Sequence, residues 1–412
     1  MKNILVIGGG FAGVWSAAGA VRAARLHAAA TAGPQAGPAE EIRVTLVSAG
    51  DDLVIRPRLY EADPESKRVA LDRVLGPIGV RRVAATVTGI DTEARSVTAL
   101  SRGGESLSLP YDRLVLATGS QTARPRFPGA EDVFDVDTMG AAAALDHHVR
   151  RLSEQAGRDG QFTAVVVGAG FTGLEVATEL TGRLAEFAPD GQAVRVVLVE
   201  RADELGPELG ATPRPHITEV VDGLGIEQRL GTTVERYEDG VVHLADGETI
   251  PASTVIWTAG MAASPLTAHI PGERDRMGRL EVDAFLRVVG APEVYAAGDT
   301  AAAVAGEGHF VTQSCQHAVP LGKFAGHNVA ADLLGTDPVP FAPAPYVTCL
   351  DLGPAGAVLT AGWDRVVQLT GQDAKQLKQQ INTEWIYPPV DDAEAILGLA
   401  DHRTIWPTDE AA

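Results

Sequence analysis

The chain has 412 residues, of which 45% are hydrophobic and 21% charged, so it can bury two or three cores and is not a disordered chain. Its net charge of −20 excludes the basic footprint of a nucleic-acid binder and opposes attraction to anionic membrane surfaces. Cys315 and Cys349 are the only cysteines. A C-x-x-C redox pair and a zinc-type cluster are therefore excluded, and we expect no metal site.

The chain opens on an apolar strand at 4–7 that runs into a glycine-rich loop, and an Ala-rich helix is predicted at 14–26. The loop has the pattern G-x-G-x-x-G, in which the glycines allow a tight turn, a close approach of pyrophosphate and close packing of helix on strand. The free N–H groups of the helix would then hold the phosphates. The candidate ligands of this first nucleotide are Gly8, Gly10, Phe11, Ala12 and Gly13.

A loop at 27–41 with two Gly-Pro pairs precedes a second predicted strand at 42–48. In dinucleotide-binding folds this strand ends on an acid that holds the ribose hydroxyls, but here the position is Ser48. A hydroxyl can still hydrogen-bond a ribose, without the charge-assisted strength of a carboxylate. Residues 51–60, around Pro57, are expected to form a loop.

Alternating apolar residues predict strands at 80–90 and 95–100, and an apolar run predicts a buried strand at 111–120 that ends on small residues. The Pro-rich segment 122–129 follows and is interpreted as a linker between domains. Residues 136–157 are predicted to be helical.

The opening pattern then repeats. A strand at 162–167 leads through a second G-x-G-x-x-G into a helix, and the next strand, 194–200, ends on Glu200. Two such units in one chain are far more specific than either alone, so two separate nucleotide sites are predicted. The candidate ligands in the second loop are Gly168, Gly170, Thr172 and Gly173.

Further strands are predicted at 253–260, which ends on Gly260, and at 294–300. A helix at 317–334 follows, opened by the residues from 313 onward, and 346–370 alternates as an antiparallel hairpin would. Cys349 is expected to be a buried strand residue.

Taken in order, the motifs G-x-G-x-x-G, A-T-G, G-x-G-x-x-G and G-D resemble the two-dinucleotide flavoprotein superfamily. Within it, nearly the whole chain is similar to type II NADH dehydrogenases and their relatives. The local matches are IRPRLYE at 55–61, GAGFTGLEVATEL at 168–180, IWTAG at 256–260, VYAAGDT at 294–300 and CLDLG at 349–353.

The resemblance implies an α/β fold with two Rossmann-like dinucleotide-binding domains and a small C-terminal α+β region. Residues 1–120 and 261–335 would form the FAD-binding domain, into which an NAD(P)H-binding domain, 121–260, is inserted. The C-terminal domain would be 336–412.

For FAD, the resemblance implies that the first glycine loop holds the pyrophosphate and that Val87 meets the adenine through its backbone. The A-T-G residues would pass near the flavin, and Asp299 would hydrogen-bond the ribityl chain. The further candidate FAD ligands are Ser48, Val87, Ala117, Thr118, Gly119, Asp299 and Gln316.

For the second nucleotide, the resemblance implies that Glu200 takes the adenosine ribose hydroxyls. A carboxylate there repels a 2′-phosphate, so NADH is expected rather than NADPH, although the adjacent Arg201 weakens the distinction. Gly260 is a further candidate. In the family, a Glu at the position of Glu175 lies close to where nicotinamide meets flavin. The alternative is that Glu175 is a first-turn acid stabilised by the helix dipole.

Gln316 matches the first Gln of the family's A-Q-x-x-x-Q quinone motif, and it is counted with Glu175 as a candidate catalytic residue. Cys315 replaces the Ala and Pro320 replaces the second Gln. A helix that begins at 315–320 would still direct N–H groups at the flavin and stabilise its anionic reduced form.

Cysteine placement separates the chain from disulfide reductases, peroxidase-type members and sulfide:quinone oxidoreductases of the superfamily. No apolar run reaches the ~18 residues of a membrane span, and no signal peptide is recognised. A helix at 372–382 offers one narrow apolar stripe with Lys375 and Lys378, and an acidic tail follows. Trp385 and Tyr387 are interpreted as packing residues. We expect a cytoplasmic protein with at most weak peripheral contact at the inner face of the membrane.

The acceptor stays open between three hypotheses. The first is an oxidoreductase that passes electrons from NADH through FAD to a quinone or a quinone-like acceptor. The second is a soluble NADH-dependent flavoenzyme with another acceptor, such as an electron-carrier protein or a biosynthetic intermediate. The third is a flavoprotein that acts through partner binding switched by NADH. A homodimer is left open.

Overall fold

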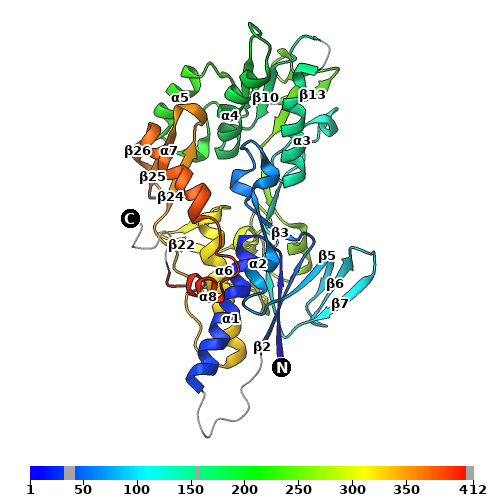
Figure 1. Cartoon of the computed structure of the whole chain (residues 1–412), viewed down its shortest axis with the longest axis vertical. Helices are drawn as coiled ribbons and strands as arrows, with labels where there is room; N and C mark the ends of the chain where they lie inside the picture. Colours follow the sequence, from blue (N-terminus) through cyan, green and yellow to red (C-terminus); the bar gives the residue numbers. More distant parts are fainter. Residues whose placement is uncertain (32–41, 155–156, 405–412) are drawn as a thin grey trace.

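The computed structural model describes residues 1–31, 42–154 and 157–404. It is an α/β fold with two Rossmann-like units and a C-terminal part that contacts both of them. Figure 1 shows the blue and yellow segments together at one end of the molecule and the green segments at the other. The orange and red C-terminal segments run along one side and contact both ends.

The first Rossmann unit is built on an eight-stranded sheet with the order β19-β20-β8-β1-β2-β5-β6-β7. Strand β1 (Lys2–Ile7) pairs in parallel with β2 (Ile42–Ser48) on one side and with β8 (Arg113–Leu116) on the other. Strand β20 (Ala291–Ala296) extends the sheet in parallel beyond β8. Early and late parts of the chain therefore share one sheet, and the second unit interrupts the first. The remaining strands are β5 (Arg81–Asp91), β6 (Ser96–Ser101), β7 (Ser106–Pro110) and β19 (Arg287–Val288).

Helices α1 (Phe11–Thr31) and α6 (Cys315–Leu334) pack closely against each other. Their backbones approach at glycines, because a Cβ on Gly326 would collide with the Ser16 carbonyl oxygen. The loop prediction for 27–31 was wrong, since Ala-rich sequence continues the helix to Thr31. The remainder of the predicted loop lies outside the described residues.

The second Rossmann unit is built on a four-stranded parallel sheet with the order β12-β11-β10-β16. Strands β10, β11 and β16 are largely apolar and buried, as expected for a parallel sheet covered by helices, whereas the edge strand β12 is polar and half-buried. A three-stranded antiparallel sheet packs beside it. The elements are α3 (Met139–Arg150), β10 (Thr163–Val167), α4 (Phe171–Phe187), β11 (Arg195–Glu200), α5 (Arg214–Gly223), β12 (Glu227–Leu230), β13 (Val234–Glu238), β14 (Val241–Leu244), β15 (Thr249–Pro251) and β16 (Thr254–Trp257).

The two crossings between the units pair with each other. Strand β9 (Ser120–Thr122) enters the second unit and β17 (Met261–Ala263) leaves it, and the two are antiparallel neighbours. The predicted Pro-rich linker therefore follows a short strand. The domain boundaries given above stay a prediction.

The C-terminal part contains a three-stranded antiparallel sheet rather than a simple hairpin, made of β24 (Val347–Asp351), β25 (Ala357–Ala361) and β26 (Val366–Thr370). Helix α7 (Gly371–Gln380) packs on this sheet and continues into a π-helical turn, Ile381–Trp385. Helix α8 (Ala393–Leu399) contacts α1.

Short elements complete the fold. The predicted loop at 51–60 was wrong in part, because β3 (Asp52–Val54) pairs with β4 (Arg68–Ala70) and a helical turn, Arg56–Arg58, follows. Pairing with a distant strand is not visible in local periodicity. The others are α2 (Leu71–Leu75), β18 (Leu280–Glu281), β21 (Ala301–Ala302), β22 (Val304–Gly306) and β23 (His309–Phe310).

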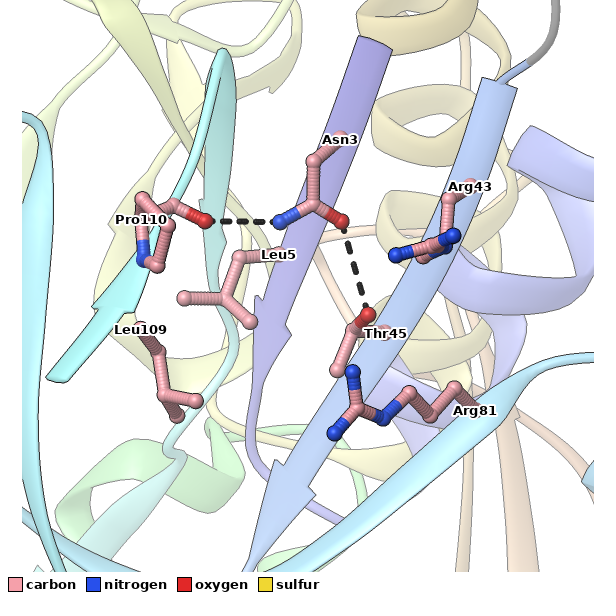
Figure 2. Close-up of a pocket in the computed structure, with 7 residues that line it drawn as sticks. All are labelled: Asn3, Leu5, Arg43, Thr45, Arg81, Leu109 and Pro110. Carbon is pink, nitrogen blue, oxygen red and sulfur yellow. Dashed lines mark hydrogen bonds between the residues drawn. The ribbon is translucent and has the colours of Figure 1, made fainter. Parts of the chain in front are cut away.

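A cavity of about 120 Å³ lies at the start of β1 and β2, where Asn3 donates to the Pro110 carbonyl (Figure 2). Ligands of open parallel sheets bind at the opposite, carboxyl ends of the strands, so this cavity is separate from the glycine loops. Within the described residues, we find no helix with both the length and the apolar character that a bilayer crossing requires.

Candidate functional site

The first glycine loop has the geometry of a pyrophosphate cradle. Gly8 has φ +118°, which non-glycine residues avoid, and a Cβ on it would collide with the Ala117 carbonyl oxygen. A Cβ on Gly13 would collide with the Gly8 carbonyl oxygen, so α1 packs tightly on the loop. No described atom lies within 4 Å of the Cβ position of Gly10, which leaves open space for a ligand to approach. Phe11 and Ala12 are buried in the first turn of α1.

The other predicted FAD ligands gather at the carboxyl ends of neighbouring strands. Ser48 ends β2, and its Oγ lies against Gly9 of the loop. Val87 lies in β5, the strand that pairs with β2. Thr118 Oγ1 is a buried hydroxyl without a hydrogen-bond partner among the described residues, which is the kind of group that a bound cofactor would satisfy. Gly119 has φ +67° and turns the chain toward β9.

Asp299 lies at the same edge, in the helical turn Gly298–Thr300 that follows β20. Ser120 Oγ donates to Asp299 Oδ2 at 2.6 Å, and Arg56 Nη1 lies 3.8 Å from the same oxygen. Burial raises the pKa of Asp299, and the Ser120 hydrogen bond and the Arg56 charge oppose that rise. Arg56 also pairs with Asp137. The carboxylate is therefore fixed beside the loop that Gly8 begins.

Arg56, Ser120 and Asp137 were missed by sequence reasoning. The sequence signal for Arg56 is the family match at 55–61, which by itself assigns no role to this arginine. Arg56 connects the first unit to Asp137 ahead of α3 in the second unit.

The second glycine loop repeats the geometry of the first. Gly168 has φ +104°, and a Cβ on Gly173 would collide with the Gly168 carbonyl oxygen. A Cβ on Gly170 would collide with the Glu208 carboxylate, so this side chain lies over the loop. Thr172 is in the first turn of α4. The backbone of this loop has the geometry of an anion cradle at a helix N-terminus.

Glu200 ends β11 beside this loop. Its Oε2 accepts from the Ala169 N–H at 2.8 Å and its Oε1 accepts from the Ala202 N–H at 2.9 Å. Each oxygen keeps lone-pair capacity for a hydroxyl. Gly260 lies past β16 with φ +75°, and its carbonyl accepts from the Ala123 N–H.

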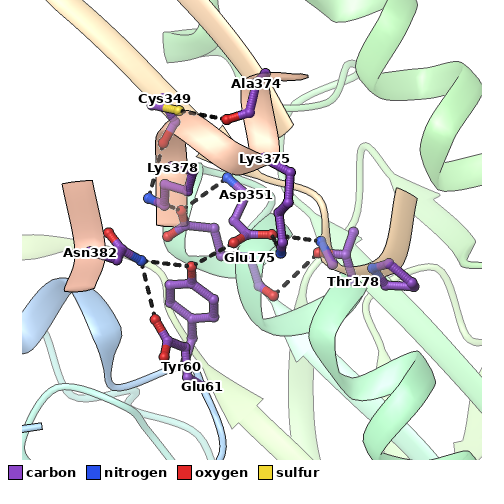
Figure 3. Close-up of polar contacts among 12 residues, drawn as sticks. Tyr60, Glu61, Glu175, Thr178, Cys349, Asp351, Ala374, Lys375, Lys378 and Asn382 are labelled. Atoms are coloured by element: carbon purple, nitrogen blue, oxygen red, sulfur yellow. Dashed lines mark hydrogen bonds and ion pairs between the residues drawn. The ribbon is translucent and has the colours of Figure 1, made fainter. Parts of the chain in front are cut away.

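Glu175 is bound to the C-terminal part of the chain (Figure 3). Lys378 Nζ donates to Glu175 Oε1 at 2.9 Å and to the Cys349 carbonyl at 3.0 Å, and the Asp351 N–H donates to the same Glu175 oxygen at 3.2 Å. The dipole alternative is wrong, because α4 begins at Phe171 and Glu175 is beyond its first turn. Burial raises the pKa of Glu175, an effect that the Lys378 cation opposes.

The surroundings of this ion pair come from three parts of the chain (Figure 3). Tyr60 Oη donates to Asp351 Oδ2 at 3.0 Å, and Lys375 donates to Asp351 Oδ1. Burial alone would lower the pKa of Lys378, but Glu175, together with Cys349 and Asp351, more than offsets this effect and raises the pKa above its usual value. Asn382 donates to Glu61 at 3.1 Å, next to Tyr60.

The two lysines of the predicted helix at 372–382 do not form a cationic outer face on α7. Lys375 and Lys378 are turned inward because each has a carboxylate partner on another element. Tyr387 packs as expected, with its hydroxyl accepting from Arg58 Nη1 at 3.1 Å.

Acidic residues of the C-terminal tail also form ion pairs or cap a helix, which the sequence alone does not reveal. Asp391 pairs with Arg73, and Asp401 pairs with Arg22. Asp392 caps α8 by accepting from two backbone N–H groups. Asp409 and Glu410 lie outside the described residues.

Gln316 is the second residue of α6, and its Nε2 donates to the Pro345 carbonyl at 3.2 Å. Pro320 lies inside the helix and has no N–H to donate to the Gln316 carbonyl. Burial raises the pKa of the Cys315 thiol, and the charges of Lys378 and Asp299 both act on it. The start of α6 therefore lies within electrostatic reach of Asp299 and of the buried ion pair.

Cys315 and Cys349 are both free thiols. Cys349 lies in β24 as expected, but it is half-buried rather than buried. Burial raises its pKa to about 11, which keeps the thiol protonated and unreactive at neutral pH.

Comparison with known proteins agrees with this geometry. The profile of the pyridine nucleotide-disulphide oxidoreductase family matches residues 2–322. The chain is 46% identical to an NADH dehydrogenase-like protein of Mycobacterium tuberculosis, over 99% of this chain and 100% of that one. It is 27% identical to the type II NADH:quinone oxidoreductase of Staphylococcus saprophyticus, over 94% and 95% of the two chains.

A solved structure, that of NDH2 from Plasmodium falciparum in complex with NADH, has the same fold with a TM-score of 0.74 at 14% identity, over 98% of both chains. The family match, the identity to the mycobacterial relative and the two glycine cradles lead to one assignment. The chain belongs to the pyridine nucleotide-disulphide oxidoreductase family and is an NADH-dependent oxidoreductase of the FAD-containing type that its motifs predicted.

Proposed function

We propose that this oxidoreductase passes electrons from NADH through FAD to a quinone, in the overall reaction NADH + H⁺ + quinone → NAD⁺ + hydroquinone. The observation that carries the proposal is the buried pair of Glu175 and Lys378, which joins the helix after the second glycine loop to the C-terminal part. Bound FAD accepts the two electrons of the hydride and releases them to the acceptor.

The nucleotide ends follow from the two cradles. In this proposal Gly8, Gly10 and Gly13 hold the FAD pyrophosphate, and Asp299 holds the ribityl hydroxyls. The loop at 168–173 holds the NADH pyrophosphate, and Glu200 accepts hydrogen bonds from the adenosine ribose. Hydride transfer would require the two cofactors held by these loops to meet in the orientation of reaction, which is the positioning that the protein would supply.

The ion pair of Glu175 and Lys378 is the basis for the quinone site in this proposal. A quinone that receives two electrons also takes up two protons, so its site needs a proton source and a positive charge. Glu175 has a pKa that burial raises, and Lys378 is held protonated beside it. In our proposal Lys378 stabilises the negative charge that arrives with the electrons, and the Glu175 carboxylate takes up a proton from solution and passes it to the quinone oxygen.

One observation favours a second candidate. Pro320 stands where the family's quinone motif has its second Gln, and only Gln316 of the two amides is present. A different acceptor, an electron-carrier protein or a biosynthetic intermediate, would not need that amide. This second candidate differs from the first only in the step that passes electrons from the reduced flavin to the acceptor.

Stopped-flow mixing separates the two candidates. Flavin in the purified protein is first bleached with NADH, and the reduced enzyme is then mixed with a short-chain ubiquinone, with menadione or with oxygenated buffer. The proposal expects quinone to restore flavin absorbance at least tenfold faster than oxygen, and Glu175→Gln to slow that step more than bleaching by NADH. If neither quinone reoxidised the flavin faster than oxygen does, the quinone proposal would be refuted and the second candidate would remain.

A further inference from the structure

The turn between β25 and β26 contacts the second Rossmann unit near its glycine loop. Thr212 Oγ1 donates to the Asp364 carbonyl at 3.2 Å, which ties the turn to the segment after β11. The Arg365 side chain runs along Gly210, and a Cβ on that glycine would lie 3.4 Å from Arg365 Cδ. A residue of the C-terminal sheet thus reaches the nucleotide-binding unit.

Stacked aromatic rings hold this turn in place. The Trp363 ring stacks on Tyr346 with centroids 4.3 Å apart, and on His309 with centroids 4.4 Å apart. These contacts join the turn to the segment before β24 and to the β22–β23 hairpin. Arg365 is therefore presented from an anchored turn, so little side-chain and loop entropy would be lost when it binds a ligand.

The Arg365 guanidinium lies over two rings, one of which belongs to the first residue of α4. Its Cζ is 5.1 Å from the centroid of the Phe171 ring and 5.3 Å from that of Tyr346. Phe171 is the first residue of α4 and directly follows Gly170 of the second glycine loop. The cation is thus held at the end of the helix to which the motif assigns the pyrophosphate.

Arg365 has hydrogen-bonding capacity that the described part of the chain does not use. Its Nη1 is buried and has no hydrogen-bond partner among the described residues, and no ion pair there includes its guanidinium. By contrast, Arg56, Arg58 and Arg183 each have a carboxylate partner. A guanidinium stays charged at any pH of interest, so a buried donor without a partner is costly unless a ligand completes it.

We infer that Arg365 binds the pyrophosphate of the nicotinamide nucleotide, so that the C-terminal sheet completes the second nucleotide site. A pyrophosphate carries two negative charges on oxygens that a guanidinium can contact through paired N–H groups. The inference rests on nucleotide binding at the second glycine loop and is independent of the acceptor.

Equilibrium binding of ADP-ribose and of AMP to the flavin-loaded protein, followed by calorimetry, tests this inference without any turnover. ADP-ribose carries the pyrophosphate and lacks the nicotinamide, whereas AMP lacks the pyrophosphate. We expect Arg365→Gln to raise the Kd of ADP-ribose about tenfold or more and to change that of AMP less than about twofold. Arg365→Lys keeps the charge but loses the paired donors, so its Kd for ADP-ribose should lie between those of the wild type and Arg365→Gln.

Arg151→Gln is the matched control, because Arg151 is an exposed arginine whose ion-pair partner among the described residues is the nearby Glu154. Flavin content and melting temperature of each variant report whether it is folded, and Arg365→Lys serves if the Gln variant does not fold. Unchanged ADP-ribose binding in a folded Arg365 variant would overturn the inference. Weaker NADH binding with unchanged ADP-ribose binding would also overturn it, and would move Arg365 to the nicotinamide end. Failure of the wild-type protein to bind ADP-ribose would instead refute the nucleotide site itself.

Discussion

Lys378 Nζ lies 2.9 Å from Glu175 Oε1, although 203 residues separate the two in the chain. The pair joins α7 to α4, and a buried ion pair is costly to break from one side because the remaining charge loses its partner. We expect Lys378→Met alone to lower the free energy of unfolding by about 3–5 kcal/mol. Urea unfolding of Lys378→Met, Glu175→Gln and the double variant checks this, because the double variant should recover most of the loss. Additive losses would show that the pair is not coupled.

Replacing Glu200 should change nucleotide choice. The carboxylate is fixed by two backbone N–H groups at the end of β11, where it can accept from ribose hydroxyls and repel a 2′-phosphate. Glu200→Ala is expected to lower kcat/KM for NADH about tenfold, which corresponds to about 1.4 kcal/mol, and to improve use of NADPH. Steady-state kinetics with both nucleotides measure this, with the exposed Glu235→Ala as control. An equal loss of kcat/KM for both nucleotides would show that Glu200 does not bind the ribose.

The contact between α1 and α6 depends on glycine. A Cβ on Gly326 would collide with the Ser16 carbonyl oxygen and force apart two helices that flank the FAD cradle. Gly326→Ala should lower the melting temperature by at least several degrees, since overpacking costs about 1–3 kcal/mol. Gly182→Ala is the control, because that helical glycine has no described atom within 4 Å of its Cβ position. The control should be neutral or stabilising by up to about 1 kcal/mol. Similar melting temperatures for the two variants would argue against the close contact.

His317 should contribute to instability in acid. It is buried in the first turn of α6, its Nδ1 accepts from the Thr312 N–H at 3.1 Å, and burial lowers its pKa to about 4. The unfolded chain has an ordinary histidine pKa of about 6.5. Between these values the unfolded state binds more protons, so stability falls as pH drops from about 6.5 toward 4, by up to about 1.4 kcal/mol per pH unit.

His317→Asn removes this titration and keeps a hydrogen-bond acceptor at the position. Urea midpoints at pH 7 and pH 5 should differ less for the variant than for the wild type, by the equivalent of about 1–2 kcal/mol. The half-buried His327, whose pKa also falls to about 4, keeps its own contribution in both proteins. The same drop in both proteins would show that His317 does not titrate as its burial implies.

Much of the fold could be predicted because its signals are local. The glycine loops at Gly8 and Gly168, the apolar strands before them and Glu200 at the end of β11 follow from patterns within about thirty residues. The Ala-rich end of α1 was mistaken for a loop because the following Gly-Pro pairs were weighted over helix propensity. The strand β3 was missed because it pairs with β4, and pairing between two separate segments leaves no mark on the local alternation of apolar residues.

The candidate site was less predictable because its side chains meet across long intervals. Lys378 occupies a polar position of an amphipathic pattern, and such a position ordinarily faces solvent. Only tertiary packing shows that a carboxylate on α4 lies opposite. Arg56 and Arg365 also belong to segments with no special spacing, and the elements that they contact come from other parts of the chain.

The paired crossings β9 and β17 have a mechanical consequence. Residues 120–122 and 261–263 form one two-stranded ribbon, so the peptide links between the two Rossmann units cannot twist independently. Swivelling of one unit against the other would break ladder hydrogen bonds, whereas bending of the ribbon would preserve them. The ribbon therefore favours bending over twisting as the way in which one unit can move against the other.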